Sequence, residues 1–576
     1  MKKVWKLKEP DYKGQKRISS DLAVTPTIAQ ILINRGISNS SDAHSFLFGD
    51  ISSCHNPFLL KDMDKAVERI KKALAKKEKM LIYGDFDVDG VTSLALLSLV
   101  FKEIGAVFET FIPNRLEDGY GLNISAVNLA KEKGVKLLIT VDCGINSFKE
   151  VEYANSIGLD VIITDHHEVR TGNIPPALAV VNTHQPACSY PYKNLAGVAV
   201  AYKLARGLLR GKEEKVDEHL DLVALGTIAD VAPLTGENRI LVKEGLKKLS
   251  SANKYGIKAL MDVAKIKSES LNSRHVAFIL APRINAMGRM GAADLALELL
   301  VCKDKNRAYE LAEILEKENR NRQNIEKALF AKAIELHQKV GSQKDNVIIL
   351  AEEGWHPGVL GIAASRMTEN YNMPTILISL NGENGRGSGR SINGFNLFEA
   401  LEKTGEHLID FGGHSAACGI KIEKKNLDNF KKAINALSSL NTTDTNNITQ
   451  EISIDLVLPF SAIGAKLIKE LELLMPFGEG NEEPLFVTRG MKVKNIPRAI
   501  AKDGFKFLVM CGNLSCEAIT FKKHGIIKPS KNDVVNIAYS LSLNTWAGID
   551  TVQMNIKDLN VLSKSVSLTQ KDSPYS

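Results

Sequence analysis

The chain has 576 residues, of which 44% are hydrophobic and 24% are charged, so we expect a globular protein of about three or four domains. Its 74 basic and 67 acidic residues leave a net charge of only +7, which by itself does not indicate nucleic-acid binding. Seven cysteines without a C-x-x-C pair argue against zinc fingers and disulfide scaffolds. Because no signal-peptide core and no bilayer-length apolar run is present, we expect a cytoplasmic protein with no membrane segment.

The first region, residues 1–55, is expected to mix helix and loop and shows no recognisable chemistry. The second, residues 56–300, alternates strand-like with helical segments between about residues 79 and 230, as parallel α/β domains do. Three carboxylates, Asp85, Asp87 and Asp89, directly follow its apolar segment 81–84. Alternate residues of an extended chain face the same way, so these three carboxylates would repel one another unless the chain turns or a divalent cation neutralises them.

This acidic segment has two other interpretations. Its spacing fits the start of an EF-hand loop, but the twelfth position counted from Asp85 is Leu96, where calcium binding needs a bidentate Glu. A polar turn that caps the helix starting near Gly90 stays open on this segment alone. We expect Asp89 to stabilise that turn rather than to bind a metal.

Further ligand-type side chains follow later elements of this region. After the segments at 135–141, 160–164 and 225–229 come Asp142, then Asp165, His166 and His167, and then Asp230. Each could separately be a helix cap, a turn residue or a surface histidine. The carboxyl ends of parallel strands meet at one edge of a sheet, so we expect these residues to converge. Carboxylates and imidazoles together suit Mn²⁺ or Mg²⁺.

The blocks at residues 84–90, 141–144, 165–167 and 226–230 resemble, in order and spacing, the four motifs of the DHH phosphoesterase superfamily. Within it, the order of blocks from about residue 20 to about residue 560 most resembles the RecJ family, bacterial 5′→3′ exonucleases specific for single-stranded DNA. Some relatives carry His where this chain has Tyr83, so Tyr83 is not counted as a ligand. The resemblance implies phosphodiester hydrolysis with two Mn²⁺ or Mg²⁺ ions.

The resemblance also implies roles for individual residues. The implied metal ligands are Asp85, Asp87, Asp142, His166 and Asp230, with Asp87 and Asp142 the best candidates for sharing by both ions. The implied catalytic residues are His167, Asp165 and Asp230. Asp165 would orient an imidazole, and His167 would polarise the phosphate or protonate the leaving group.

A long connecting helix is predicted within residues 301–344. The sequence contains neither Gly nor Pro from residue 292 to 340, and its apolar residues keep a helical period. A single helix of about 35 residues would span roughly 50 Å and could join two domains.

The next region, residues 345–440, is predicted to be a second α/β domain and resembles the DHHA1 type. We expect its glycines at 385, 387 and 389 to let backbone amides approach an anion, and Arg390 to grip a phosphate. A glycine-rich hairpin with two solvated arginines stays open. The full set of predicted substrate-binding residues is Arg115, Arg283, Arg289, Arg386, Arg390, Ser391 and His414.

The C-terminal part changes pattern. A polar linker is expected at 441–447, residues 448–563 read as short strands of a small barrel, and 564–576 are expected to be a disordered tail. The predicted fold is therefore α/β, with a DHH-type parallel-sheet domain and a DHHA1-type α/β domain joined by a long helix, plus a C-terminal β-rich OB-like domain.

We therefore predict a metal-dependent exonuclease that degrades single-stranded DNA 5′→3′ to 5′-mononucleotides in recombination and repair. Two alternatives stay open. A small-molecule or short-oligonucleotide phosphodiesterase of the same superfamily would leave the long helix and the β-rich end unexplained. A non-catalytic single-strand-binding protein would leave the intact ligand set unexplained. The resemblance further implies a helicase and a single-strand-binding protein as partners, and we expect a monomer.

Overall fold

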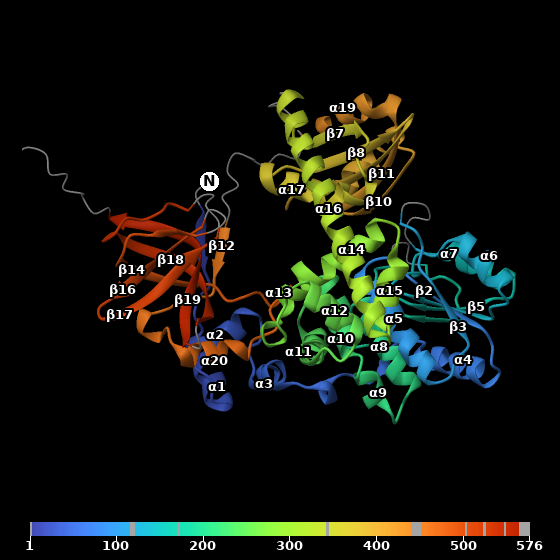
Figure 1. Ribbon diagram of the computed structural model, residues 1–576, viewed down its shortest axis with the longest axis horizontal. Coiled ribbons are helices and arrows are strands. Elements are labelled where there is room, and N and C mark those ends of the chain that lie inside the picture. The colour runs from blue at the N-terminus through green and yellow to red at the C-terminus, as the bar shows by residue number, and fades with distance from the viewer. Residues whose placement is uncertain are drawn as a thin grey trace, which may run out of the picture. The chain divides into compact units, whose positions relative to one another are not determined.

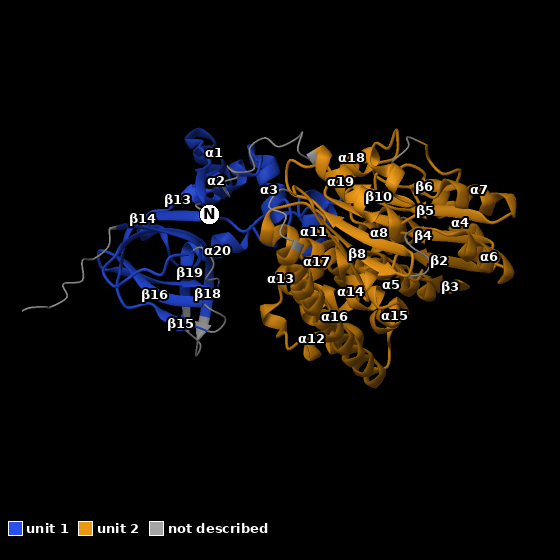
Figure 2. Cartoon of the chain, turned by 90° about the horizontal axis from the view of Figure 1, so that it is seen from above, with its two compact units in different colours: residues 1–54, 233–243, 447–576 blue, residues 55–232, 244–446 orange. Residues whose placement is uncertain are grey.

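The computed structural model describes residues 3–115, 121–169, 173–340, 345–438, 451–500, 504–521, 526–546 and 549–563. The chain forms two compact units (Figure 2): unit 1 combines residues 1–54, 233–243 and 447–576, and unit 2 combines residues 55–232 and 244–446. The six-part division expected from the sequence is finer than this, and its boundaries remain a proposal. The expected linker at 441–447 and tail at 564–576 lie outside the described residues.

Unit 2 contains a five-stranded parallel sheet in the order β3-β2-β4-β5-β6 (Figure 1). Its strands are β2 (Met80–Gly84), β3 (Phe108–Phe111), β4 (Leu137–Val141), β5 (Asp160–Thr164) and β6 (Ala179–Val181). β2 and β4 are buried along their whole length, which explains their largely apolar sequences. Because the strands are parallel, their carboxyl ends share one edge of the sheet.

Helices cover both faces of this sheet. One face packs on α6 (Ile124–Glu132) and α7 (Phe148–Ser156), which share a core with Leu81 and Leu138. The other face contacts α4 (Met63–Ala75), α5 (Val88–Glu103) and α8 (Gly197–Leu208). The remaining helices of this part are α9 (Glu213–Asp217), α10 (Leu220–Ala229), α11 (Gly236–Ser251), α12 (Tyr255–Val263), α13 (Ser273–His275), α14 (Ala281–Arg289) and α15 (Ala293–Val301).

The predicted long helix is confirmed as α16 (Lys305–Val340), which has 36 residues and at 1.5 Å per residue spans about 54 Å. It contacts α12, α14 and α15 on one side, and α17 (Leu360–Tyr371) and β7 (Ile348–Glu353) of the second sheet on the other. In Figure 1 it runs between these two parts of unit 2.

The second sheet has the order β10-β11-β9-β8-β7, with only β7 and β8 parallel. The other strands are β8 (Thr375–Asn381), β9 (Asn384–Arg390), β10 (Asp410–His414) and β11 (Ala417–Glu423), and the other helices are α18 (Leu397–Lys403) and α19 (Leu427–Ser438).

The glycines of β9 have a different purpose from the one we expected. β9 lies between β8 and β11 and pairs with both along its length, so its amides belong to the sheet rather than to an anion site. A Cβ at Gly387 would lie 2.6 Å from Cγ1 of Ile420, and one at Gly389 would lie 2.7 Å from Cδ2 of Leu397. The glycines therefore allow close packing of the apolar core, and the expectation of amide–anion contacts was wrong.

Unit 1 contains the predicted barrel. Strands β14 (Phe486–Val493), β18 (Val534–Trp546), β19 (Ile549–Ser563), β17 (Leu514–Thr520) and β16 (Gly504–Cys511) pair in this order, and a further pairing of β14 with β16 closes the barrel. The flanking elements are β12 (Glu451–Ile454), β13 (Leu456–Val457), β15 (Arg498–Ile500) and α20 (Ala465–Glu472).

The N-terminal residues of unit 1 pack on this barrel, which no sequence pattern had indicated. β1 (Val4–Leu7) pairs in parallel with β12, and α1 (Tyr12–Leu22), α2 (Pro26–Asn34) and α3 (Ser40–Phe48) share the barrel's hydrophobic core. Arg239 is buried and donates hydrogen bonds to the carbonyls of Phe46, Leu473 and Leu474, which joins the three segments of the unit. Across the described ranges, we find no helix with the length and apolarity to cross a bilayer.

Candidate metal centre

The loop after β2 combines a helix cap with a buried carboxylate. Asp87 caps α5 by accepting hydrogen bonds from the amides of Asp89 (2.9 Å) and Gly90 (3.2 Å), so the capping interpretation of this segment holds as well. The turn requires glycine at position 90, where a Cβ would lie 2.4 Å from the carbonyl oxygen of Asp85. Asp85 is only 3% exposed, and its Oδ1 has no hydrogen-bond partner among the described residues.

The side chain of Asp89 contacts the distant helix α8. Its carboxylate accepts hydrogen bonds from the amides of Gly197 (2.6 Å) and Val198 (2.9 Å) at the start of α8. Its Oδ2 also lies 3.8 Å from Nε2 of His166. Asp89 therefore ties the first helix of the site to a helix more than a hundred residues later.

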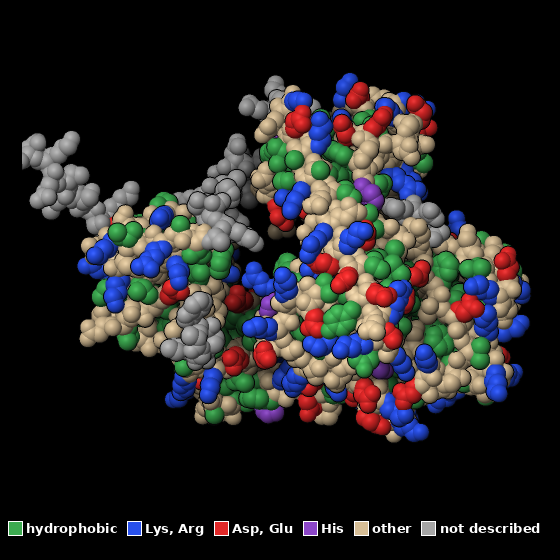
Figure 3. Space-filling model, in the orientation of Figure 1, with side chains coloured by type: hydrophobic (Ala, Val, Ile, Leu, Met, Phe, Trp, Pro, Cys, Tyr) green, Lys and Arg blue, Asp and Glu red, His purple; other side chains and the backbone are tan. Residues whose placement is uncertain are grey.

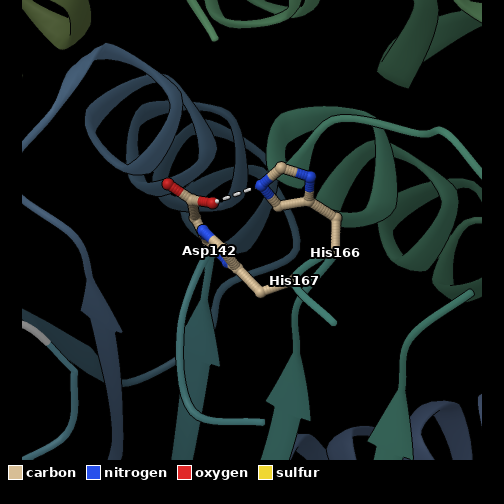
Figure 4. Close-up of side chains that lie close together, drawn as sticks. All are labelled: Asp142, His166 and His167. Carbon is tan, nitrogen blue, oxygen red and sulfur yellow. Dashed lines mark ion pairs between the residues drawn. The ribbon is translucent and has the colours of Figure 1, made fainter. Parts of the chain in front are cut away.

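Asp142 follows β4 in a left-handed conformation, with φ of 59°, which Asp adopts more readily than most residues. Its amide donates to the carbonyl of Thr164, so the ends of β4 and β5 are held together. Its Oδ1 lies 3.1 Å from Nε2 of His166 (Figure 4), yet neither buried atom has a partner with hydrogen-bond geometry among the described residues. Two buried ligand atoms that face each other without a hydrogen bond are the arrangement expected at a cation site.

The Asp165 side chain positions both histidines. One oxygen accepts hydrogen bonds from the amides of His166 (2.7 Å) and His167 (3.1 Å) and contacts Nδ1 of His167 at 2.7 Å. The other accepts from the amide of Ile145. Burial alone would raise the pKa of Asp165, but the hydrogen bond and charge of His167 lower it to about 2. The same contact outweighs burial at His167 and raises the pKa of that imidazole to about 9.

The predicted ligands come together in three overlapping groups, each with its ligand atoms within 4.8 Å of one another. The groups are Asp85, Asp87 and Asp142; Asp142, His166 and His167; and Asp89, His166 and Asp230. All five predicted ligands belong to these groups, and two residues not predicted as ligands, Asp89 and His167, join them. Because neighbouring groups share Asp142 or His166, the arrangement suits two adjacent divalent ions.

The electrostatics of the site also favour cations. Burial, followed by repulsion between the carboxylates, raises the pKa of Asp85 and Asp142 well above the usual range, that of Asp230 to about 9 and that of Asp89 to about 7. Burial and the neighbouring His167 lower the pKa of His166 to about 4, which keeps the imidazole in its metal-binding neutral form. Divalent ions would neutralise the crowded carboxylates.

The metal-free protein should lose stability as the pH rises. A carboxyl group with a higher pKa in the folded than in the unfolded chain binds more protons when folded, so the free energy of unfolding falls between about pH 4 and the folded pKa, which is about 9 for Asp230. For each additional proton bound by the folded chain, the free energy of unfolding falls by at most about 1.4 kcal/mol per pH unit. We expect Tm in EDTA to fall between about pH 5.5 and about pH 8.5, and Mn²⁺ to abolish most of that fall. An equal pH dependence with and without Mn²⁺ would contradict the metal assignment.

A group of arginines adjoins the carboxylates. Arg115 stacks on the ring of Phe86 at 4.9 Å, and the charges of Asp85 and Asp87 act on it. Arg289 donates to the carbonyl of Gly358 at 2.9 Å. Burial, and then the charges of Arg115, Arg322 and Arg390, lower the pKa of Arg289. Arg115, Arg289 and Arg390 form no ion pair with any described residue, so a bound anion would relieve their repulsion.

The other four predicted substrate-binding residues are either exposed or bonded to other residues of the protein. Arg283 forms a buried ion pair with Glu316 at 2.7 Å, which gives its charge a structural function between α14 and α16. Arg386 and His414 are exposed on β9 and at the end of β10. The Ser391 hydroxyl donates to the carbonyl of Phe395 at 2.7 Å. Substrate contacts by these four residues remain a proposal.

One glycine outside the predicted motifs shapes the centre. At Gly197, the first residue of α8, a Cβ would lie 2.6 Å from Oδ1 of Asp142 and 2.8 Å from its Cβ. We expect Gly197→Ala to displace Asp142 and to weaken metal binding by about 10- to 100-fold, the range for residues that position metal ligands. Titration calorimetry with Mn²⁺ measures this. Gly207→Ala in the same helix is the control, because its Cβ would meet only side chains, at 3.3 Å or more; equal metal affinity in both variants would contradict the assignment.

The chain matches three family models: the DHH family, N-terminal domain, over residues 79–227; the DHHA1 domain over residues 344–439; and the RecJ OB domain over residues 454–558. It is 36% identical over 564 residues to the single-stranded-DNA-specific exonuclease RecJ of Bacillus subtilis, covering 97% of this chain and 71% of that protein. The chain belongs to the RecJ family. The RecJ of Escherichia coli is 32% identical over 560 residues, covering 93% of this chain and 96% of that protein.

A solved structure of the RecJ family has the same fold. Thermus thermophilus RecJ in complex with Mn²⁺ superposes with a TM-score of 0.82 and 29% sequence identity, covering 97% of this chain and 79% of that chain. A structure of the same RecJ in complex with Mg²⁺ has a TM-score of 0.76 at 28% identity, over 96% of this chain and 78% of that chain. The predicted α/β fold with a parallel sheet, a long helix and a barrel is confirmed.

Proposed function

We propose that this chain is a single-strand-specific DNA exonuclease that removes 5′-mononucleotides in the 5′→3′ direction. The observation that carries this function is that the charge of Arg115 interacts both with the carboxylates of Asp85 and Asp87 and with Arg289 and Arg390. In this proposal the arginines hold the terminal phosphate of the strand, and the neighbouring phosphodiester lies at the carboxylates. Membership of the RecJ family supports the choice of single-stranded DNA.

The proposed metal ligands are Asp85, Asp87, Asp142, His166 and Asp230, holding two Mn²⁺ or Mg²⁺ ions. When bound, such ions supply Lewis-acid polarisation of a phosphodiester and neutralise developing negative charge. The contribution of the protein is positioning. Asp87 is fixed by the amides of α5, and Asp142 is fixed by the pairing of its amide with Thr164. Asp89 holds α8 against the site through the amides of Gly197 and Val198.

His167 is the proposed proton donor to the leaving oxygen. The contact between its Nδ1 and Asp165 orients the ring and raises the pKa of the imidazole to about 9, which favours the protonated form near neutral pH. Nε2 is then the ring nitrogen that acts on the substrate. Asp165, which is buried and fixed by three backbone amides, is a positioning residue.

Arg390→Ala tests the substrate class. Its guanidinium is oriented by Ser388 Oγ and the Gly389 carbonyl, and it forms no carboxylate ion pair among the described residues. We expect the variant to bind single strands about tenfold more weakly, with a salt dependence reduced by about one counterion, equally for strands of different sequence. The loss should be larger for strands with a 5′ phosphate. Fluorescence anisotropy at several salt concentrations measures this.

The control for this prediction is Lys421→Ala, an exposed cation of the same sheet that pairs with Asp410. Normal cleavage of long strands by Arg390→Ala, combined with lost activity on a dinucleotide, would favour a small-molecule phosphodiesterase. Unchanged binding of both substrates would remove Arg390 from the site.

We propose that the chain acts in recombination and repair as a monomer in the cytoplasm, with a single-strand-binding protein and a helicase as partners. On the visible face of the molecule, Lys and Arg side chains are interspersed with acidic ones (Figure 3), in keeping with the small net charge. The resemblance to the RecJ family supports these partners.

A further inference from the structure

One cavity of unit 2 lies at the far ends of two helices that carry residues of the metal centre. Its volume is about 850 Å³. α5 is capped by Asp87 at the metal centre and ends at Glu103 in this cavity, while α10 follows His219 in the cavity and is capped at its end by Asp230. α5 has 16 residues, which corresponds to about 24 Å. A ligand in this cavity would therefore not contact the metal centre.

Three lysines from separate segments line the cavity, and none of them forms an ion pair with a described residue. Lys102 comes from α5, Lys248 from α11, and Lys303 follows α15. All three are exposed, and no described carboxylate forms an ion pair with any of them. By contrast, the lining residues Glu103 and Lys254 are neutralised by Lys215 and Asp221. Since Glu218 is the one lining carboxylate without such a partner among the described residues, the cavity has an excess of positive charge.

Uncharged groups in the cavity add directional contacts. Tyr255, the first residue of α12, is 47% exposed and offers an aromatic face. Nδ1 of His219 is buried without a hydrogen-bond partner among the described residues. Burial and the charge of Lys254 lower the pKa of His219 to about 4, so the ring is neutral near pH 7, with one nitrogen that donates a hydrogen bond and one that accepts.

We propose that this cavity binds a nucleoside diphosphate, with its phosphates among Lys102, Lys248 and Lys303 and its base against Tyr255. The cavity lies within the usual range of about 300 to 1,000 Å³ for small-ligand sites. A diphosphate carries about three negative charges near neutral pH, since its last ionisation lies near pH 6. Three lysine ammonium groups match that charge, and lysine binds phosphate as a point charge. Polar groups such as the His219 imidazole can hydrogen-bond the sugar or base.

Calorimetric titration of the full-length protein with ADP in EDTA tests the proposal. We expect saturable binding that the triple variant Lys102→Gln, Lys248→Gln, Lys303→Gln weakens at least about tenfold, which corresponds to about 1.4 kcal/mol. The three side chains are exposed and make no ion pair among the described residues, so Tm should be unchanged. Lys247→Gln is the matched control, because Lys247 adjoins Lys248 in α11 but is absent from the cavity lining and pairs with Glu244.

Two further variants complete the experiment. One tests whether ADP binds at this cavity or at the catalytic site, and the other tests whether Tyr255 contacts the base or the phosphates. Arg390→Ala should bind ADP like the parent protein, and Tyr255→Ala should weaken ADP but not inorganic pyrophosphate. Absence of binding up to millimolar ADP would overturn the proposal. So would parent-like affinity in the triple variant, loss of binding in Arg390→Ala alone, or equal affinity for adenosine and ADP.

Discussion

Asp142→Asn is expected to reduce hydrolysis of single-stranded DNA by at least about 1,000-fold while the protein stays folded. Asp142 belongs to two of the three ligand groups, and its Oδ1 lies 3.1 Å from Nε2 of His166. Asn is also tolerated in the left-handed conformation that this position requires. The substitution therefore removes the charge without breaking the turn. Single-turnover release of labelled nucleotide with Mn²⁺ measures the loss.

A stability measurement separates this effect from misfolding. Burial and the neighbouring carboxylates raise the pKa of Asp142, so removing its charge should leave Tm of the metal-free protein unchanged or higher. In Mn²⁺, the variant should gain less stability than the parent, because it binds the ions more weakly. The control is Asp160→Asn at the opposite end of the sheet, where the carboxylate pairs with Arg69. Near-normal turnover of Asp142→Asn at saturating Mn²⁺ would refute its assignment as a ligand.

His167→Ala is expected to slow hydrolysis by at least about 100-fold with little change in Mn²⁺ affinity. The contact with Asp165 at 2.7 Å orients His167, the residue that we propose as the proton donor. His166→Ala is the contrast, because the Nε2 atom of His166 faces Asp142 and its loss should weaken metal binding. Rate measurements across a pH series, combined with Mn²⁺ calorimetry, distinguish the two residues. Loss of one bound Mn²⁺ in His167→Ala would make His167 a ligand instead of an acid.

The centre of the site could be predicted because its residues lie at the ends of parallel strands. Asp85, Asp142 and Asp165 each follow a buried apolar segment, and the common direction of β2, β4 and β5 brings them to one edge. The helical period of residues 305–340 and the strand-like segments of the barrel could also be recognised in the sequence. In these parts, local periodicity and three-dimensional structure agree.

The remaining features depend on contacts between distant segments. Asp89 reaches the amides of Gly197 and Val198, and no local pattern marks that partner. The pairing of β1 with β12 brings residues 4–7 to residues 451–454, and the exposure of these strands gives no strong apolar signal. The glycines of β9 were misinterpreted because the same alternation suits close core packing and anion binding.

The most direct test of the proposed function is digestion of a 5′-phosphorylated, uniformly labelled single strand beside the matching duplex, in Mn²⁺ and in EDTA. We predict release of 5′-mononucleotides from the single strand in Mn²⁺, little release from the duplex and none in EDTA, with Asp142→Asn as the inactive control. Degradation starting from the 3′ end, equal digestion of the duplex, or activity confined to dinucleotides would contradict a single-strand-specific 5′→3′ exonuclease.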